Sequence, residues 1–230
     1  MSRKFKIWLP HIRLNQEKLA VKTADAIFVP CKQDKNFLMS NLRVKPSKVF
    51  TIPRGVSREL FVNNNKKGRD KDLIFVGWWG QRKGIKYLGE AFTQVCRRYP
   101  EARLTIVGSK ADDGEVYASF PPCIHDNIKV HRSMPHSNLI KEYKRHKIMI
   151  FPSLFEGFGM AFLEGMAAGL AVVASWEGGA REIIRDRENG ILVPPRSGKS
   201  LAEKVIYLLE NEDIREKIGQ RAAETARNYT

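Results

Sequence analysis

Short apolar runs alternate with longer amphipathic segments along most of this chain. The apolar runs are rich in β-branched residues and predict buried strands, at residues 73–76, 103–107, 128–130, 148–151, 171–174 and 191–193. The segments between them place apolar residues at helical spacing and predict helices near 84–98, 137–145, 159–168, 179–185, 198–210 and 213–228. Strands that alternate with helices in this way predict an α/β fold with a doubly wound parallel sheet, Rossmann-like in arrangement.

The residues before 73 show the same alternation on a smaller scale. Helices at 12–23 and 32–42 each precede a short strand, at 26–30 and 48–52. A polar, turn-rich stretch from Asn63 to Asp70 then predicts a linker. We therefore divide the chain into an N-terminal part, a linker and a main domain, at residues 1–62, 63–72 and 73–230.

The composition indicates a globular protein. At 230 residues and 43% hydrophobic composition, the chain is long enough to bury one full α/β core. No apolar run approaches the roughly 20 residues that span a bilayer, and the N-terminus lacks the long apolar centre of a signal peptide. Three widely spaced cysteines, Cys31, Cys96 and Cys123, suit reduced thiols. We expect a soluble protein of the cytoplasm.

The net charge of +15 lies in the first part of the chain. Residues 1–100 contain 22 Lys and Arg against 7 Asp and Glu, whereas residues 101–230 contain 18 of each kind. This excess fits an anionic membrane surface, an acidic substrate, or a solvated basic surface without a partner. Nucleic acid ranks lowest as a partner, because no recognisable binding motif accompanies the charge.

The N-terminal segment 4–13 mixes cations with apolar residues such as Phe5 and Trp8. Such a mixture suits a lipid headgroup boundary, or packing beneath the domain. We expect Pro10 to break a helix here, so that any helix on a membrane is short. A peripheral position at the inner face of the membrane is therefore one expectation.

The residues after the predicted strand at 148–151 carry the strongest chemical signal. A short loop there holds Glu156 and two glycines, and a helix starts near Gly159 or Met160. Glycines let a ligand approach backbone N–H groups, and a helix N-terminus attracts anions. Glu164, one turn into the helix, can accept hydrogen bonds from hydroxyl groups. This pattern favours a ligand with phosphate and sugar, although a glycine-rich loop can also serve only as a tight turn.

The spacing of Glu156 and Glu164 resembles the E-x7-E signature of retaining glycosyltransferases with the GT-B fold, the group 1 glycosyl transferase family. Further segments resemble those of the family in the same order, namely Phe75–Gly77 with Arg82–Gly84, Leu104–Gly108, Ser175–Ile183 and Asn189–Pro194. The resemblance covers roughly residues 20–230. It implies that the chain is the C-terminal, donor-binding half of a GT-B enzyme. Residues 1–62 would then be the end of the N-terminal Rossmann domain and the crossing between the domains.

The resemblance also implies roles for individual residues. Lys83 and Arg82 would stabilise the departing diphosphate, and Glu156 would contact the sugar being transferred. Glu164 would bind the ribose hydroxyls, and the base would lie near Met134. The expected donor contacts, some of them through backbone N–H groups, are Gly77, Lys83, Met134, Gly157, Phe158, Gly159, Met160 and Glu164. The donor substrate is a nucleotide-diphospho-sugar, and no metal or other cofactor is expected.

One position departs from the family pattern. The residue after Gly77 is usually arginine in the family, but it is Trp78 here, with Trp79 beside it. Losing that guanidinium removes a bidentate phosphate contact that lysine does not replace. Arg82 could take over this contact, while the two tryptophans either pack within the domain or stack on a base or sugar.

Two groups of residues resemble metal ligands only superficially. The segment Asp70–Asp72 matches the D-x-D motif of a different glycosyltransferase fold, but it lies in the predicted linker. Cys123, His125, His131 and His136 lie near one another in the chain, yet their spacing fits no zinc pattern. We therefore assign no metal site.

By the same resemblance, the chain contains only the last elements of the acceptor-binding half of a GT-B enzyme. Either the sequence is a truncated gene fragment, or a partner or second copy supplies that half. We expect the chain alone to bind the donor but to transfer sugar slowly or not at all, because half a cleft cannot orient an acceptor. The alternatives are a non-catalytic nucleotide-sugar-binding module and a GT-B-like epimerase that acts on the donor sugar.

Overall fold

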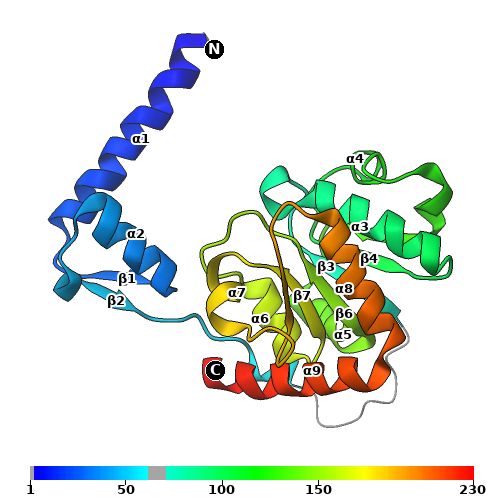
Figure 1. Cartoon of the computed structure of the whole chain (residues 1–230). Coiled ribbons are helices and arrows are strands. Elements are labelled where there is room, and N and C mark those ends of the chain that lie inside the picture. Colours follow the sequence, from blue (N-terminus) through cyan, green and yellow to red (C-terminus); the bar gives the residue numbers. More distant parts are fainter. Residues whose placement is uncertain (1–2, 62–70) are drawn as a thin grey trace. The chain divides into compact units, whose positions relative to one another are not determined.

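The computed structural model describes residues 3–61 and 71–230, with the backbone alone described for residues 3–12 and Lys71. The chain divides into two compact units, Met1–Pro53 and Arg54–Thr230 (Figure 1). The linker predicted at 63–72 lies almost entirely outside the described residues, and its last two residues begin a strand.

The first unit is a small α/β layer. Its elements are α1 (Arg3–Thr23), β1 (Ile27–Val29), α2 (Lys32–Leu42), the 3-10 segment η1 (Pro46–Lys48) and β2 (Val49–Thr51). β1 and β2 pair in parallel, and a small core forms around Val29, Val44 and Val49, with residues of both helices packed against it. Phe28 and Phe50, which are opposite each other in the register, are exposed, with ring centroids 5.7 Å apart. The two paired strands, β1 and β2, therefore have apolar side chains on both faces, as is usual for strands of a larger parallel sheet.

Helix α1 is longer than the sequence predicts. The helix expected at 12–23 begins at Arg3 and continues through Pro10, so the expectation that Pro10 breaks it is wrong. A proline removes one N–H donor and crowds the preceding turn, but helical residues on both sides can continue the helix past it. Apart from Arg13, the side chains of the segment expected at a membrane surface, 4–13, lie outside the described residues.

The described part of the second unit contains a six-stranded sheet and helices on both of its faces. Its strands are β3 (Lys71–Val76), β4 (Leu104–Val107), β5 (Ile128–His131), β6 (His146–Phe151), β7 (Ala171–Ser175) and β8 (Ile191–Val193). Its helices are α3 (Ile85–Arg98), α4 (Asp113–Tyr117), α5 (His136–Arg145), α6 (Met160–Ala167), α7 (Gly178–Ile183), α8 (Gly198–Glu210) and α9 (Glu212–Ala226). Short 3-10 segments are η2 (Arg58–Leu60), η3 (Gln81–Lys83), η4 (Pro122–Asn127) and η5 (Arg227–Tyr229).

The strands of this sheet are parallel and follow the order β5-β4-β3-β6-β7-β8. The chain enters this sheet in its middle, at β3, and adds β4 and β5 on one side. It then crosses back to β6, next to β3, and adds β7 and β8 on the other side. The strand order therefore reverses between β3 and β6. In doubly wound sheets, ligands bind at the carboxyl ends of the strands beside such a switch point. Residues that follow β3 and β6 are thus the first candidates for a binding site.

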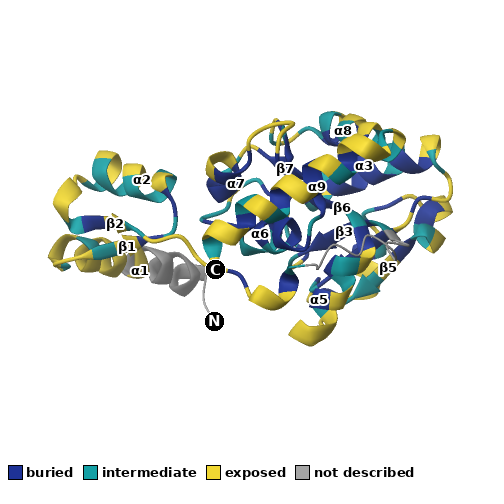
Figure 2. Cartoon of the chain, turned by 90° about the horizontal axis from the view of Figure 1, so that it is seen from below, coloured by how far each residue is buried: buried dark blue, intermediate teal, exposed yellow. Residues whose placement is uncertain are grey.

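Two helical layers cover the sheet (Figures 1 and 2). On one face, α3 packs against α8, and Leu73 and Phe75 of β3 join the core there. On the other face, α6 packs through Phe162, whose ring centroid lies 5.5 Å from that of Phe151 in β6. Because the central strands β3 and β6 are covered on both faces, their last four residues, 73–76 and 148–151, are all apolar and buried.

The predicted fold class is confirmed as an α/β unit with a parallel sheet flanked by helices. In the second unit, each predicted strand and helix is present with ends within two residues of the prediction. Helix α4 is absent from the prediction, because its five residues are too few to show helical periodicity. Within residues 3–61 and 71–230, no helix is both long and apolar enough to span a membrane.

Candidate functional site

An ion pair joins the two loops at the switch point. Lys83 ends η3, which follows β3, and Glu156 lies in the loop after β6. Lys83 Nζ donates to Glu156 Oε1, and the two side chains are only 12% and 10% exposed. Ser153 Oγ donates to the same carboxylate oxygen at 3.0 Å. The family resemblance assigns both charged residues to the donor site, and the structure brings them into direct contact.

The backbone fixes the position of Lys83. The N–H of Leu154 donates to the carbonyl oxygen of Arg82 at 2.8 Å, which links the loop after β6 to η3. Gly84 follows η3 with φ of +71°, and a Cβ there would overlap the carbonyl oxygen of Pro152. Only glycine allows both this left-handed conformation and this close approach. Lys83 is therefore held by the packing of two loops.

The stem of Lys83 crosses the end of β3. Its Cε would lie 3.5 Å from a Cβ added to Gly77, the residue after that strand. Its Nζ is 5.5 Å from the ring centroid of Phe151, the last residue of β6. The ammonium group thus has a carboxylate and an aromatic face as partners, and Gly77 leaves room for the methylene groups behind it.

The loop that enters α6 presents backbone groups. Gly159 is the N-cap of α6, with φ of +86°. Phe158 is buried, and its ring centroid lies 6.2 Å from that of Tyr229, so its side chain belongs to the core. The first N–H groups of α6, from Met160 onward, have no acceptor within the helix and can bind an anion.

Helix α7 contacts the backbone of the loop between β6 and α6. The N–H of Gly179 donates to the carbonyl oxygen of Gly157 at 3.1 Å. A Cβ on Gly178 would overlap the carbonyl oxygen of Glu156. The glycine pair after β7 therefore lets the backbone of α7 approach the backbone of the loop, which keeps the loop in one conformation.

Glu164 lies in α6, four residues after Met160. Tyr143 of α5 is fully buried and donates its hydroxyl to Glu164 Oε2 at 2.9 Å. Burial raises the pKa of the Glu164 carboxyl, while the hydrogen bond from Tyr143 and the charge of His136 lower it. Burial and the neighbouring carboxylate also raise the pKa of Tyr143 well above its usual value, so the phenol remains protonated and donates.

Arg82 makes a contact outside the ion pair. Its guanidinium carbon lies 5.8 Å from the ring centroid of Trp78, which is 41% exposed. Trp79 is buried and packs edge-on against Phe75. The two tryptophans thus have different surroundings, one in the core and one at the surface. Contact of Arg82 with phosphate stays a prediction.

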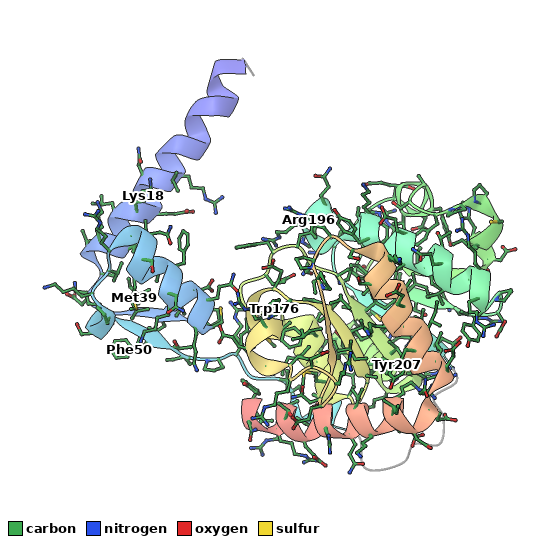
Figure 3. All side chains as sticks on the ribbon, in the orientation of Figure 1. Lys18, Met39, Phe50, Trp176, Arg196 and Tyr207 are labelled. Carbon is green, nitrogen blue, oxygen red and sulfur yellow. The ribbon has the colours of Figure 1, made fainter. Side chains whose placement is uncertain are left out.

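A second exposed tryptophan, Trp176, directly follows β7 and is labelled beside α7 in Figure 3. The guanidinium carbon of Arg181 lies 4.7 Å from its ring centroid. Because β6 lies between β3 and β7, the loops that carry Trp78 and Trp176 lie on either side of the loop that carries Glu156. The edge of the sheet therefore presents aromatic surface as well as charge.

Met134 lies in the loop between β5 and α5, and β5 is separated from β6 by β4 and β3. Its side chain lines a cavity of about 520 Å³ together with residues of α5 such as Asn138 and Lys141. The same loop leads to His136, whose charge acts on Glu164. The loop therefore approaches the second carboxylate, but contact of Met134 with a nucleotide base stays a prediction.

Two buried hydroxyl groups at the site are absent from the sequence prediction. Ser153 could have been suspected, since it follows a predicted strand and lies three residues before Glu156. Tyr143 gave no such signal, because an aromatic residue on the apolar face of a helix usually indicates core packing.

Two of the residues considered as metal ligands, Asp72 and His125, make other contacts. Lys147 Nζ donates to Asp72 Oδ1 at 2.9 Å, and Asp70 lies outside the described residues. His125 Nε2 lies 3.1 Å from the carbonyl oxygen of Phe120. In the part of the chain that the structure describes, no three His, Cys, Asp or Glu side chains gather as a metal site would require.

The carboxyl edge of the sheet therefore combines a lysine, a helix N-terminus and two carboxylates. Among the described residues, none donates a hydrogen bond to Glu156 Oε2 or to Glu164 Oε1. A buried side-chain oxygen without a hydrogen-bond partner is found at neither position, so both of these oxygens are accessible to solvent. The cation and the N–H groups suit phosphate oxygens, and the free carboxylate oxygens suit sugar hydroxyls. This edge can bind a ligand that joins phosphate to sugar.

Comparisons with known proteins agree with this chemistry. The sequence model of a family described as Glycosyl transferases group 1 matches residues 56–225. An uncharacterised glycosyltransferase of Methanocaldococcus jannaschii is 28% identical over 222 residues, which are 93% of this chain and 58% of that protein. The chain thus spans somewhat more than half the length of the curated relatives that it matches.

Two solved structures show the same fold. Sucrose-phosphate synthase from Thermosynechococcus elongatus gives a TM-score of 0.81 at 25% identity, and the match covers 95% of this chain and 57% of that one. The C-terminal domain of the glycosyl transferase group 1 family protein LpcC from Francisella tularensis gives a TM-score of 0.67 at 25% identity. That match covers 76% of this chain and 97% of the LpcC domain.

Proposed function

The chain belongs to the glycosyl transferases group 1 family, and we propose that it is the donor-binding half of a retaining glycosyltransferase. The donor is a nucleotide-diphospho-sugar bound at the carboxyl ends of β3 and β6. The observation that carries this proposal is the buried contact of Lys83 with Glu156 at the switch point, next to the N-terminus of the helix that holds Glu164. Together they offer a partner for each part of such a donor.

We assign the parts of the donor as follows. The diphosphate oxygens accept hydrogen bonds from Lys83 Nζ and the first N–H groups of α6, and Arg82 can turn from its ring contact toward them. The ribose hydroxyls donate to the free oxygen of Glu164. The hydroxyls of the transferred sugar donate to the free oxygen of Glu156, and the base lies near Met134.

The chemistry follows from where charge develops. As the bond between sugar and diphosphate breaks, negative charge gathers on the departing diphosphate. Lys83 and the N-terminus of α6 stabilise that charge without a metal ion. In the free protein Glu156 neutralises Lys83, so an arriving diphosphate draws the ammonium group toward itself and makes the carboxylate available to the sugar. Retention of configuration at the anomeric carbon is part of the proposal and rests on the E-x7-E signature.

The acceptor-binding half, we propose, corresponds to the part of the relatives that this chain does not match. The chain covers 58% of the Methanocaldococcus jannaschii protein and 57% of sucrose-phosphate synthase. The rest of a longer chain, a partner or a second copy would then complete the cleft. An acceptor at the inner, anionic surface of a membrane would suit the positive charge of residues 1–100 and a cytoplasmic location.

Calorimetric titration with UDP-glucose, GDP-mannose and ADP-glucose tests the proposal. We expect at least one of them to bind, and Glu164→Gln to weaken that binding about tenfold through loss of a charge-assisted hydrogen bond. The control is Glu188→Gln, which changes an exposed surface glutamate. Equal affinity of wild type and Glu164→Gln, or no binding by any of the three, would contradict the proposal. Binding without slow hydrolysis of the donor would favour the alternative of a non-catalytic binding module.

A further inference from the structure

We infer that Ser153 and Tyr143 are positioning residues, each of which holds one oxygen of a signature carboxylate so that the other oxygen faces the donor. This inference rests on the proposed function and adds to it two residues that do not touch the donor themselves. It predicts that both hydroxyl groups affect donor binding, and that they do so only through Glu156 and Glu164.

Ser153 determines which oxygen of Glu156 is free. Its side chain is 1% exposed, and its hydroxyl donates to Oε1 at 3.0 Å. The ammonium group of Lys83 donates to the same oxygen. Two donors on Oε1 leave Oε2 without a donor among the described residues, and Oε2 reaches the solvent. The carboxylate is thereby oriented before any sugar arrives.

Tyr143 does the same for Glu164 from a different helix. It lies in α5 and is fully buried, and its hydroxyl donates to Glu164 Oε2 at 2.9 Å. The carbonyl oxygen of Ala161 is farther from that hydroxyl, at 3.4 Å. A phenol has one proton to donate, and the shorter contact to an ionised acceptor is the stronger hydrogen bond. Oε1 is therefore left for the ribose.

The two contacts share one physical consequence. A glutamate side chain has several rotatable bonds, and an unheld carboxylate must be ordered when the ligand binds. A buried hydroxyl that already fixes one oxygen removes part of that cost. The groups that act on Glu164 are Tyr143 and His136, both from α5, and the hydrogen bond from Tyr143 also favours the ionised form of the carboxyl.

The test uses Tyr143→Phe and Ser153→Ala, titrated with the donor that binds among UDP-glucose, GDP-mannose and ADP-glucose. Each variant should bind the donor about tenfold more weakly than the wild type. The controls lose a hydrogen bond elsewhere: Tyr117→Phe removes a contact to the Ile128 carbonyl, and Thr105→Val removes a contact to His146. Both controls should bind the donor like the wild type.

Double variants separate positioning from a general effect on the fold. If Tyr143 acts only through Glu164, then Tyr143→Phe should cause no further loss of affinity in a Glu164→Gln background. The same holds for Ser153→Ala in a Glu156→Gln background. Full additivity of the losses in both pairs would overturn the inference.

A measurement without ligand tests the Tyr143 contact independently of the proposed function. The pKa of the Glu164 carboxyl can be followed by carbon NMR in protein labelled at the glutamate carboxyl. The pKa should rise in Tyr143→Phe, because a hydrogen bond that favours the ionised form is lost. An unchanged pKa would overturn the inference. If the pKa rises while Glu164→Gln itself leaves donor binding unchanged, then the contact exists and the proposed function fails instead.

Discussion

The substitution Lys83→Ala removes the cation that pairs with Glu156 at the switch point. Both side chains are about nine-tenths buried, so the remaining carboxylate loses its counter-charge in a place with little water. Among the described residues it keeps the hydrogen bond from Ser153 at 3.0 Å. Removing one partner of a buried ion pair costs about 3–5 kcal/mol of stability. Because Ser153 remains and the pair keeps some contact with water, we expect the lower value, about 3 kcal/mol.

The same substitution should weaken the binding of phosphate far more than the binding of the nucleoside. Loss of a charge-assisted hydrogen bond to phosphate costs about 1.5–3 kcal/mol, or about 10- to 150-fold in affinity. The unpaired carboxylate of Glu156 also repels the diphosphate, which adds to this loss. A nucleoside keeps its contacts with Glu164, so its affinity should change less than about twofold.

Calorimetric titration measures the affinities for a nucleoside and for its diphosphate. Three such pairs are tested, formed by uridine, guanosine and adenosine, each with its own diphosphate. Urea denaturation measures the change in stability. The matched control is Lys86→Ala, which removes the same charge from a pair with Glu90 at 3.9 Å whose side chains are 76% and 45% exposed. Such a surface pair contributes about 0–1 kcal/mol, so this control should resemble the wild type in both measurements.

Two results would contradict a direct contact of Lys83 with phosphate. The first is a similar loss of affinity for the nucleoside and for its diphosphate, since that would indicate a general disturbance of the site. The second is an effect of Lys86→Ala on diphosphate binding as large as that of Lys83→Ala, since that would indicate long-range attraction by positive charge. In neither case would the direct phosphate contact be supported.

Other predictions concern stability, pH dependence and thiol reactivity. Asn189→Ala should destabilise the fold by about 2–4 kcal/mol in urea denaturation, because this buried side chain makes three hydrogen bonds of 2.7–3.1 Å. Donor affinity should fall as the pH is lowered through the pKa of Glu164, which burial raises, and this step should be absent from a calorimetric pH series on Glu164→Gln. Since the raised pKa means that ionised Glu164 costs stability, the free energy of unfolding should rise on lowering the pH through the same range. Cys123 is exposed, whereas burial raises the pKa of Cys96 to about 11, so mass spectrometry after brief labelling at pH 8 should find the reagent on Cys123 first.

The sequence predicts the second unit closely because its strands are buried on both faces. A run such as 148–151 is short, apolar throughout and followed by a proline, and such a run predicts a buried strand. The meeting of Glu156 with the residues after β3 follows partly from the rule that parallel strands end at one edge. The ion pair itself depends on β3 and β6 being neighbours, and that strand order is a property of the folded chain.

The remaining features depend on packing that a local pattern does not reveal. Tyr143 resembles a core residue in the sequence, and only the packing of α5 against α6 brings its hydroxyl to Glu164. Trp78 and Trp79 are adjacent and identical, yet one is exposed and the other is buried because the chain turns just after β3. Pro10 predicts a helix end from local chemistry alone, whereas α1 continues past it.

The most direct test of the proposed donor site is a crystal structure of the chain with the nucleoside diphosphate that binds. The proposed donor site requires phosphate oxygens within about 3.2 Å of Lys83 Nζ and of the first N–H groups of α6, and ribose hydroxyls within about 3.0 Å of Glu164. A nucleotide bound elsewhere on the chain, with the Lys83–Glu156 pair intact and Glu164 without a ligand contact, would contradict it.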